Sequence, residues 1–260
     1  MCGLTGFLLS EFMDESVARR RLSSMAATIH HRGPDDDGVW TDGQVGLGFK
    51  RLAIIDLTPA GHQPMGSADG RVWLVFNGEI YNFPELRTEL EAKGYSFRSH
   101  SDTEVILAGY LAWGEKILNR LRGMFAIAIW DARTRRLMLA RDRIGKKPLY
   151  YALTPKGLFF GSEIKAILAW PGIERQADLV ALHHFLSYQY IPAPHTAFRS
   201  VRKLPAASVM SVSLDAEGRL STPQVERYWR LPGPRPSSRS SFDARAAADE
   251  LTERLKEAVK

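Results

Sequence analysis

Short hydrophobic runs separated by turn residues dominate the first two thirds of the chain. Residues 72–76 are rich in β-branched and aromatic side chains, which predicts a buried strand ending at Phe76. Residues 124–130 and 136–140 flank a short polar segment and predict a hairpin. Residues 158–160 predict a further strand. The pattern therefore indicates a β-rich domain.

Helical segments lie between these strands. Pro84 suits the first turn of a helix that Gly94 ends, and Ser101 with Glu104 predicts a capping box at the start of the next helix. Residues 178–188 predict another helix. Because strands and helices are mixed without regular βαβ alternation, we expect an α+β layered sandwich and not a doubly wound sheet.

The last third of the chain differs in composition. We expect residues 1–190 to form the main domain, with 191–230 as its peripheral hairpin extension, built around a turn at 215–218. Residues 231–241 are rich in proline, serine and arginine, which predicts a linker.

The final segment, 242–260, predicts an amphipathic helix. Leu251, Leu255 and Val259 lie one turn apart on one face. A compact domain rarely finishes with a linker and a lone amphipathic helix. We therefore expect this helix to be the start of a second, truncated domain.

Composition and charge narrow the classes of function. The 260 residues are 45% hydrophobic and 25% charged, which is typical of globular proteins, and no apolar run approaches the roughly 20 residues of a membrane span. A single cysteine excludes an intrachain disulfide and fits the cytoplasm. The net charge of +6 is spread along the chain without an arginine-rich tail. A solvated basic surface explains it better than nucleic-acid binding, so we expect neither nucleic acid nor membrane as a partner.

The only cysteine stands at position 2, where its backbone offers a second reactive group. Small second residues permit removal of the initiator methionine, and Cys2 would then carry a free α-amine beside its thiol. An α-amine titrates at about 7.7–8.0, so it can act as a base for the thiol, whose anion is the nucleophile. Position alone leaves a buried, incidental or lipidated cysteine as an alternative, although no upstream signal segment for lipidation exists.

Seven short stretches, in order along the chain, accompany Cys2: 1–7, 31–35, 51–56, 76–82, 101–104, 141–151 and 161–165. In these stretches the chain resembles the class II glutamine amidotransferases, and among them most closely the glutaminase domain of glutamine-hydrolysing asparagine synthetases. Each motif is short, but seven in register are highly specific.

The resemblance implies the N-terminal nucleophile hydrolase fold, a four-layer αββα sandwich. It also implies an enzyme that hydrolyses the side-chain amide of glutamine through a Cys2 thioester and supplies ammonia to an ATP-dependent asparagine synthetase domain. That domain is missing from this chain, and residues 242–260 would be its first helix. No cofactor is expected for the glutaminase step, because ATP and Mg²⁺ belong to the missing domain. Expected partners are glutamine and the synthetase domain, and a homodimer is left open.

The resemblance assigns the oxyanion hole to Asn77 and Gly78, through the Asn77 side-chain amide and the Gly78 backbone N–H. Hydrolysis of an amide passes through a tetrahedral oxyanion, which needs preorganised donors. Both residues are expected just beyond the strand 72–76. An ordinary Asn-Gly turn is the alternative.

The resemblance places the charges of free glutamine on three further residues. Arg51 matches the clamp for the α-carboxylate, since a guanidinium can bind both carboxylate oxygens. Asp102 matches the acceptor of the α-ammonium group, with Glu79 as a second contact. Arg51 as a surface arginine and Asp102 as a helix cap are the alternatives.

Other chemistry-bearing residues are given structural roles. His30 and His31 invite a Cys–His dyad, which we reject because the α-amine already supplies a base. The remaining histidines lack metal-ligand spacing, so no metal site is expected. The basic run 141–147 has no glycine-rich phosphate loop, which favours a structural or interdomain role. A non-catalytic scaffold, or an amidotransferase of the same branch with a different acceptor, remains the alternative function.

Overall fold

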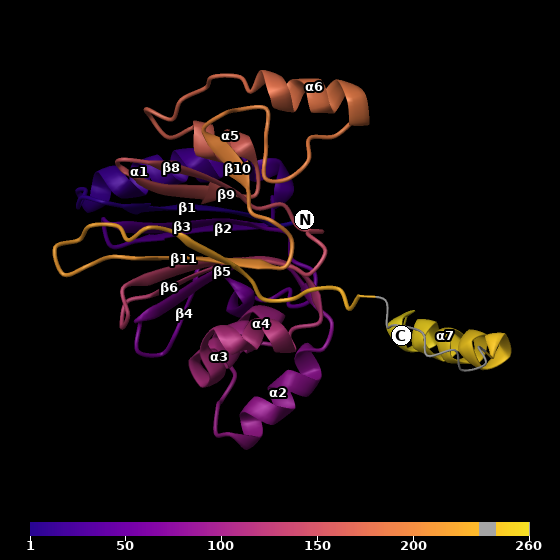
Figure 1. The fold of residues 1–260 in the computed structure, drawn as a ribbon. Coiled ribbons are helices and arrows are strands. Elements are labelled where there is room, and N and C mark those ends of the chain that lie inside the picture. The colour runs from indigo at the N-terminus through magenta and orange to yellow at the C-terminus, as the bar shows by residue number, and fades with distance from the viewer. Residues whose placement is uncertain (234–242, 260) are drawn as a thin grey trace. The chain divides into compact units, whose positions relative to one another are not determined.

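The computed structural model describes residues 1–233 and 243–259, which fall into two compact units, Met1–Arg230 and Leu231–Lys260. The first unit contains two six-stranded antiparallel sheets stacked face to face (Figure 1). Its strands are β1 (Gly3–Leu9), β2 (Asp36–Thr41), β3 (Val45–Arg51), β4 (Met65–Gly66), β5 (Val72–Ile80), β6 (Gly123–Asp131), β7 (Arg136–Arg141), β8 (Tyr150–Thr154), β9 (Gly157–Gly161), β10 (Val201–Lys203), β11 (Ser208–Ser213) and β12 (Gln224–Arg227).

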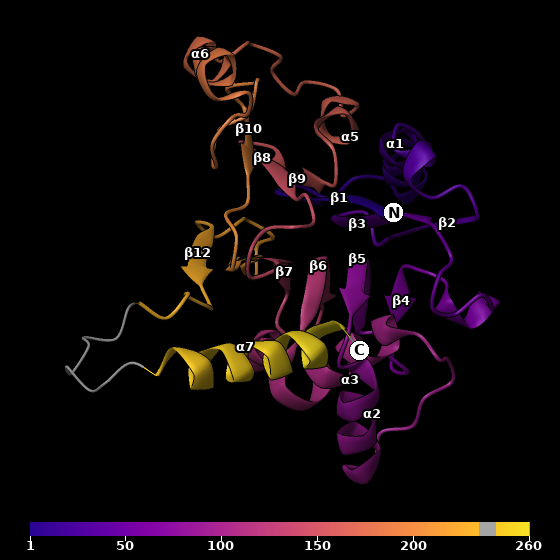
Figure 2. The same cartoon turned by 90° about the vertical axis from the view of Figure 1, so that its right-hand side faces the viewer.

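The first sheet has the order β10-β8-β9-β1-β3-β2, and the second has the order β12-β11-β7-β6-β5-β4. The outer helices are α1 (Glu15–Ala27), α2 (Phe83–Ala92), α3 (Asp102–Trp113), α4 (Ile117–Arg120), α5 (Ile164–Leu168) and α6 (Leu179–Tyr188). Three 3₁₀ turns cover His30–Arg32, Pro59–Gly61 and Gly114–Lys116. The N-terminus lies at one end of the sandwich, the end that faces the viewer in Figure 2.

Three apolar clusters hold the layers together. The middle cluster joins the inner faces of both sheets, for example Leu47 of β3 with Val75 of β5. A second cluster packs α1 and α5 on the first sheet, and a third packs α2, α3 and α4 on the second. The layers therefore run helix, sheet, sheet, helix, as the resemblance predicted.

Strand β5 is longer than the sequence pattern predicts. The hydrophobic run ends at Phe76, but β5 continues to Ile80, and Asn77 and Gly78 pair with Ala126 and Phe125 of β6. The expectation that Asn77 and Gly78 lie beyond the strand is therefore wrong, and the alternative of an Asn-Gly turn is wrong as well. Pairing along the whole length of β6 overrides the local turn preference.

The segment expected as a peripheral hairpin is built into the sheets. Strand β11 is second from the edge of the second sheet, where it pairs with both β7 and β12, and most of it is buried. Strand β10 extends the first sheet at its edge. Alternating apolar residues such as Val209 and Val212 face the cores, which explains why this segment is not merely appended.

The capping box predicted for α3 forms only in half. The Ser101 hydroxyl accepts a hydrogen bond from the Thr103 N–H at 3.1 Å, as an N-cap should. The Glu104 carboxylate instead accepts from the Ser99 N–H at 2.8 Å and the Arg98 N–H at 3.1 Å. Glu104 therefore secures the loop before α3 and does not return to the Ser101 N–H.

The second unit contains helix α7 (Ala244–Val259). Asp243 precedes it and accepts hydrogen bonds from the N–H groups of Arg245 and Ala246. Leu251 and Leu255 are exposed on this helix. Most of the predicted linker, from residue 234 onward, lies outside the described residues.

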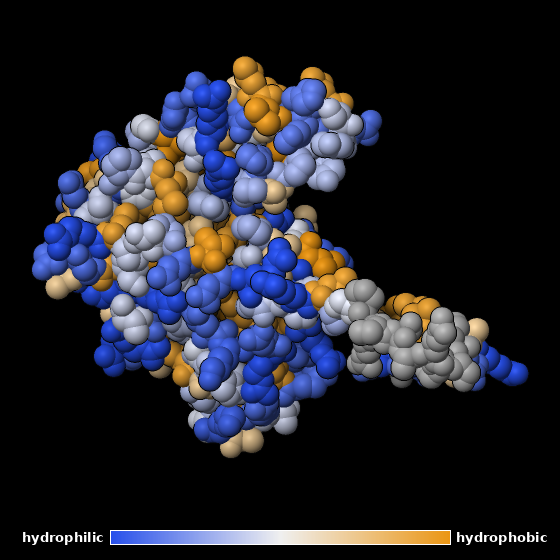
Figure 3. Space-filling view, in the orientation of Figure 1, coloured by the Kyte–Doolittle hydropathy of each residue, from blue (hydrophilic) through white to orange (hydrophobic). Residues whose placement is uncertain are grey.

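The face of the first unit that Figure 3 shows is mostly polar, with an apolar patch over α6. Leu179, Val180 and Leu186 of α6 are exposed there. In the described part of the chain, no helix is long and apolar enough to cross a membrane.

Candidate functional site

A pocket of about 270 Å³ opens where the start of β1, the end of β3 and the end of β5 meet. All six residues that the sequence singled out line it. They are Cys2, Arg51, Asn77, Gly78, Glu79 and Asp102, and their neighbours in the wall include Leu52, Gln63, Ser101, Met124 and Lys147. The structure thus brings together residues that lie up to a hundred positions apart in the sequence.

Cys2 precedes β1, whose buried pairing with β3 fixes its position. Its sulfur receives a hydrogen bond from the Leu52 N–H at 3.3 Å and lies 3.4 Å from the Leu52 carbonyl oxygen. Burial raises the pKa of the thiol, while the Leu52 N–H, the amino terminus and Arg51 act in the opposite direction. A backbone donor aimed at the sulfur stabilises a thiolate there.

The edge of β5 opposite β6 carries the Gly78 N–H, beyond the short pairing of β5 with β4. Successive N–H groups of an antiparallel strand point to opposite edges, so those of Phe76, Gly78 and Ile80 share one edge. At this edge the Phe76 N–H donates to Gln63 Oε1 at 2.6 Å, and the Ile80 N–H donates to Asp102 Oδ2 at 3.0 Å. The Gly78 N–H lies between these two donors and faces the pocket.

Asn77 supplies a second donor at the same place. It is 1% exposed, and its Nδ2 has no hydrogen-bond partner among the described residues. Side chains two positions apart share a face of a strand, so Asn77 faces the first sheet, as Val75 does in the inter-sheet core. A buried amide without a partner is costly, which makes it a candidate for holding a negatively charged oxygen of a ligand.

Packing against neighbouring atoms explains why position 78 is a glycine, and the sequence alone did not indicate this. A Cβ atom there would lie 2.1 Å from the Met124 carbonyl oxygen and 2.6 Å from the Phe76 ring. Close approach of β6, and not only access for a substrate, therefore requires the missing side chain.

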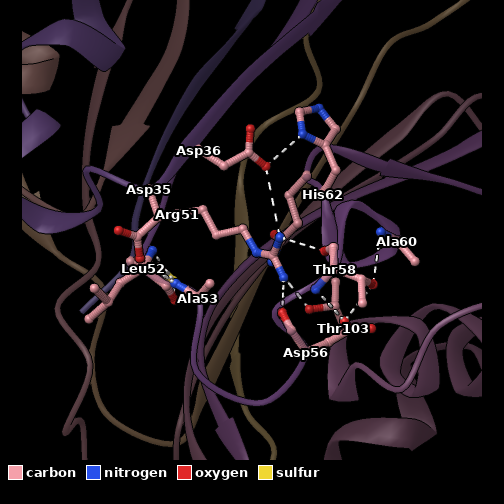
Figure 4. Close-up of polar contacts among 12 residues, drawn as sticks. Asp35, Asp36, Arg51, Leu52, Ala53, Asp56, Thr58, Ala60, His62 and Thr103 are labelled. Atoms are coloured by element: carbon pink, nitrogen blue, oxygen red, sulfur yellow. Dashed lines mark hydrogen bonds and ion pairs between the residues drawn. The ribbon is translucent and has the colours of Figure 1, made fainter.

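Arg51, at the end of β3, is buried and points toward the loop that follows it (Figure 4). Its Nη1 donates to the Thr58 carbonyl at 2.9 Å, its Nη2 donates to the Asp56 carbonyl, and Asp36 lies 4.0 Å from Nη1. A guanidinium has five N–H donors, so these bonds orient it and leave donors for a carboxylate. The alternative of an ordinary surface arginine is excluded by this burial.

Asp102 is the first residue of α3 and is 4% exposed. Burial raises its pKa to about 6, and the nearby Glu79 adds to the rise. Ser101, and not Asp102, is the N-cap. Among the described residues, no cationic side chain is bound to the buried Asp102 carboxylate, which lies in the pocket that also holds Arg51 and Glu79. Such a carboxylate gains from a ligand ammonium group.

Arg32 and Lys147 belong to the site, although the sequence analysis did not select them. Arg32 Nε donates to the Cys2 carbonyl oxygen at 2.9 Å, and its Nη1 donates to Glu163 at 3.1 Å. Lys147 lines the pocket and is buried. Arg32 lies in the matching stretch 31–35 and Lys147 in the stretch 141–151, where it is also part of the basic run given a structural or interdomain role.

The histidines do not enter the pocket wall of the described chain. His31 Nε2 lies 2.8 Å from Glu163 Oε1, which places it in the Arg32–Glu163 network. The described residues contain no group of three or more histidine, cysteine or carboxylate side chains arranged to hold a metal ion.

Residues 1–229 match the family model of the glutamine amidotransferase domain. The chain belongs to this family, in its class II branch. It is related to the glutamine-hydrolysing asparagine synthetases, as the sequence motifs predicted.

Two relatives show the extent of this similarity. Asparagine synthetase (glutamine-hydrolysing) 1 of Bacillus subtilis is 41% identical over 221 residues, which cover 84% of this chain and 34% of the relative. A putative asparagine synthetase of Mycobacterium bovis is 39% identical over 279 residues, covering 100% of this chain and 41% of the relative. The chain therefore spans well under half the length of these relatives.

Solved structures agree on the fold. The glutamine phosphoribosylpyrophosphate amidotransferase from B. subtilis, in complex with ADP and GMP, superposes with a TM-score of 0.60 at 20% identity. The match covers 88% of this chain and 50% of that structure. The predicted α+β fold, a four-layer αββα sandwich with two antiparallel sheets, is thereby confirmed.

Proposed function

We propose that this chain hydrolyses the side-chain amide of glutamine to glutamate and ammonia. The observation that carries the proposal is the pocket itself. It combines a nucleophilic sulfur, the unpaired buried amide of Asn77, the cation of Arg51 and the carboxylate of Asp102. One cation and one anion fit the α-carboxylate and α-ammonium groups of a free amino acid, because leaving either charge unpaired would be costly.

The reaction would begin after removal of Met1, which frees the α-amine of Cys2. The amine takes the thiol proton, directly or through one water, and the sulfur attacks the amide carbon of glutamine. The Asn77 Nδ2 and the Gly78 N–H donate to the resulting oxyanion. The protonated amine then gives its proton to the leaving nitrogen, ammonia departs, and water hydrolyses the thioester to glutamate and free Cys2.

Arg51 and Asp102 hold the two ends of glutamine in this scheme, and Glu79 gives the ammonium a second contact. The glutaminase step uses no cofactor. We propose that ammonia passes to an asparagine synthetase domain that uses ATP and Mg²⁺, because the relatives are named as asparagine synthetases and exceed this chain in length. An acceptor other than aspartate is the second candidate, and a non-catalytic scaffold is the third. The complete set of pocket residues favours catalysis.

Release of ammonia from L-glutamine tests the proposal. The protein, shown by intact mass to lack Met1, should release glutamate and ammonia in equal amounts. Added hydroxylamine should divert part of the product to γ-glutamyl hydroxamate, because a thioester is open to this nucleophile. No ammonia release by the processed protein would reject the enzymatic function and favour the scaffold.

Asp102 should make glutamine use depend on pH in the acid range. Its pKa is raised to about 6, mainly by burial, so protonation below that pH removes the charge that pairs with the substrate ammonium. We expect kcat/KM to fall as pH drops through about 6. Asp102→Asn should raise KM at pH 8 at least about tenfold, because a charge-assisted hydrogen bond is lost.

The stability of the fold should change with pH in the direction opposite to kcat/KM, because the Asp102 contribution to stability is larger at low pH. A carboxyl group whose pKa is raised by folding favours the folded state below its unfolded pKa, near 4, and this contribution is lost as pH rises through 6. Asp102→Asn should therefore stabilise the free protein at pH 8 by up to about 3 kcal/mol. Thermal unfolding at pH 4 and pH 8 measures this difference in stability.

The binding prediction has its own contrary outcome. An Asp102→Asn variant with unchanged KM at pH 8 would argue against the ammonium contact.

A further inference from the structure

Lys147 is a buried amine that the proposed reaction leaves unused. Lys147 is 5% exposed. The backbone N–H of Lys147 donates to Asp142 Oδ2 at 2.9 Å, which fixes the turn that carries the residue. Its Nζ reaches into the pocket and lies 3.0 Å from the sulfur of Met1, the residue joined to Cys2. The ammonium group therefore belongs to the same pocket wall as the nucleophile, close enough for the charge of Cys2 to affect Lys147.

Lys147 has no matching partner for its charge. Within residues 1–233 and 243–259, no carboxylate forms an ion pair with it, and the thioether of Met1 is only a weak acceptor. Burial lowers the pKa of Lys147, with Arg32 contributing in the same direction, while Cys2, Glu79 and Asp142 oppose the shift. An unpaired buried cation at a site of chemistry points to a functional role more than to a stabilising one.

The charged groups that face Cys2 or Lys147 are Arg32, Arg51, Glu79, Asp102 and Asp142. Two of these are cations with partners of their own. Arg32 is paired with Glu163, and Arg51 donates to main-chain carbonyls. Of the three cationic side chains Arg32, Arg51 and Lys147, Lys147 is thus the one that lacks both kinds of partner among the described residues.

We propose that Lys147 is a positioning residue for the nucleophile, whose ammonium group favours the deprotonated state of Cys2 after Met1 has left. This inference rests on the proposed glutaminase function and concerns the same site. A nearby positive charge disfavours the α-ammonium form of Cys2 and favours its thiolate. Both effects lower the pH at which the amine–thiol pair loses its first proton, so the nucleophile is ready at a lower pH.

Alkylation of Cys2 by iodoacetamide measures this state without glutamine. The probe reacts with the thiolate, and the absence of substrate removes the contribution of Asp102 to substrate binding. Lys147→Met retains a long, unbranched side chain and removes the charged ammonium group. We expect the midpoint of the pH–rate profile to rise by at least about one unit, which makes alkylation about tenfold slower below the midpoint.

Two variants serve as controls. Lys146→Met changes the neighbouring exposed lysine and should leave the alkylation profile as in the unmodified sequence. Lys147→Arg retains a positive charge and should keep the midpoint near its original value, even if its larger side chain lowers kcat. A folded Lys147→Met protein with an unshifted profile would overturn the inference.

A measurement on the unsubstituted protein covers the case of a variant that does not fold. Coupling between two titrating groups is reciprocal, so alkylating Cys2 should lower the pKa of Lys147, which a ¹³Cε NMR titration reports. No change in that titration would also overturn the inference. Failure of the proposed function is a different result, because the unsubstituted protein would then alkylate at Cys2 but release no ammonia from glutamine.

Discussion

Replacing Cys2 by alanine lowers glutamine hydrolysis by at least about a thousandfold, the largest loss that we expect from any single substitution in this protein. The sulfur is the atom that forms the covalent intermediate in the proposed reaction, and removal of a nucleophile typically costs a large part of the rate enhancement. Alanine is small enough for Met1 to be removed, so the α-amine is retained. Ammonia release at saturating glutamine, with intact mass as a check of processing, measures the effect.

Cys2→Ser is the matched control for shape. A hydroxyl fills nearly the same space beside Leu52, but it is a much weaker nucleophile than a thiolate, so activity should stay near that of the alanine variant. Both variants should unfold within a few degrees of the unsubstituted protein, because the Cys2 sulfur makes two long contacts with the Leu52 backbone, while the Arg32 bond to the Cys2 carbonyl is kept. Alanine-variant activity within tenfold of the original would show that another group performs the attack.

The motifs predicted the position of the site better than the hydrophobic pattern predicted its strands. The pattern ended β5 at Phe76 because Asn77 and Gly78 have low strand preference. In the structure the two residues continue the strand, since β6 pairs with them and Gly78 has room only for hydrogen. A local pattern cannot contain this information, because the partner strand lies almost fifty residues away.

Glycines also made two strands of the first sheet hard to predict from the sequence. Strands β1 and β3 contain Gly6, Gly46 and Gly48, which weaken any strand pattern. The structure explains Gly6, where a Cβ atom would lie 2.3 Å from the Gly46 carbonyl oxygen and 2.4 Å from the Phe160 ring. Close packing of β1 against its neighbours therefore requires the residue that makes β1 hard to predict.

Arg32 and Lys147 show a different limit of the sequence. Each is a common basic residue within a longer motif, and neither has a spacing that indicates its contact. Arg32 reaches the Cys2 carbonyl only because the turn His30–Arg32 packs beside β3, and Lys147 reaches the pocket only through the turn bound by Asp142. Their roles depend on tertiary structure, which the motif order implies but does not describe.

Asn77→Ala should lower kcat by about 10²–10³ while KM changes little. The Nδ2 group is buried, unpaired among the described residues and part of the pocket wall, so it is available when negative charge develops on the substrate oxygen. Loss of one such donor has this cost in other enzymes. Because the Nδ2 group has no hydrogen-bond partner in the described part of the chain, its removal should leave thermal stability unchanged or slightly higher.

Asn82 provides the matched control, since its amide is fully engaged outside the pocket. Asn82 Nδ2 donates to the Arg120 carbonyl at 3.0 Å, and its Oδ1 accepts from the Arg122 N–H at 2.8 Å. Asn82→Ala should therefore lower stability by about 1–3 kcal/mol and leave kcat within a few-fold of its original value. If Asn77→Ala instead destabilised the fold and kept its kcat, the unpaired amide would be a structural feature, and the oxyanion would have to be held by Gly78 and another donor.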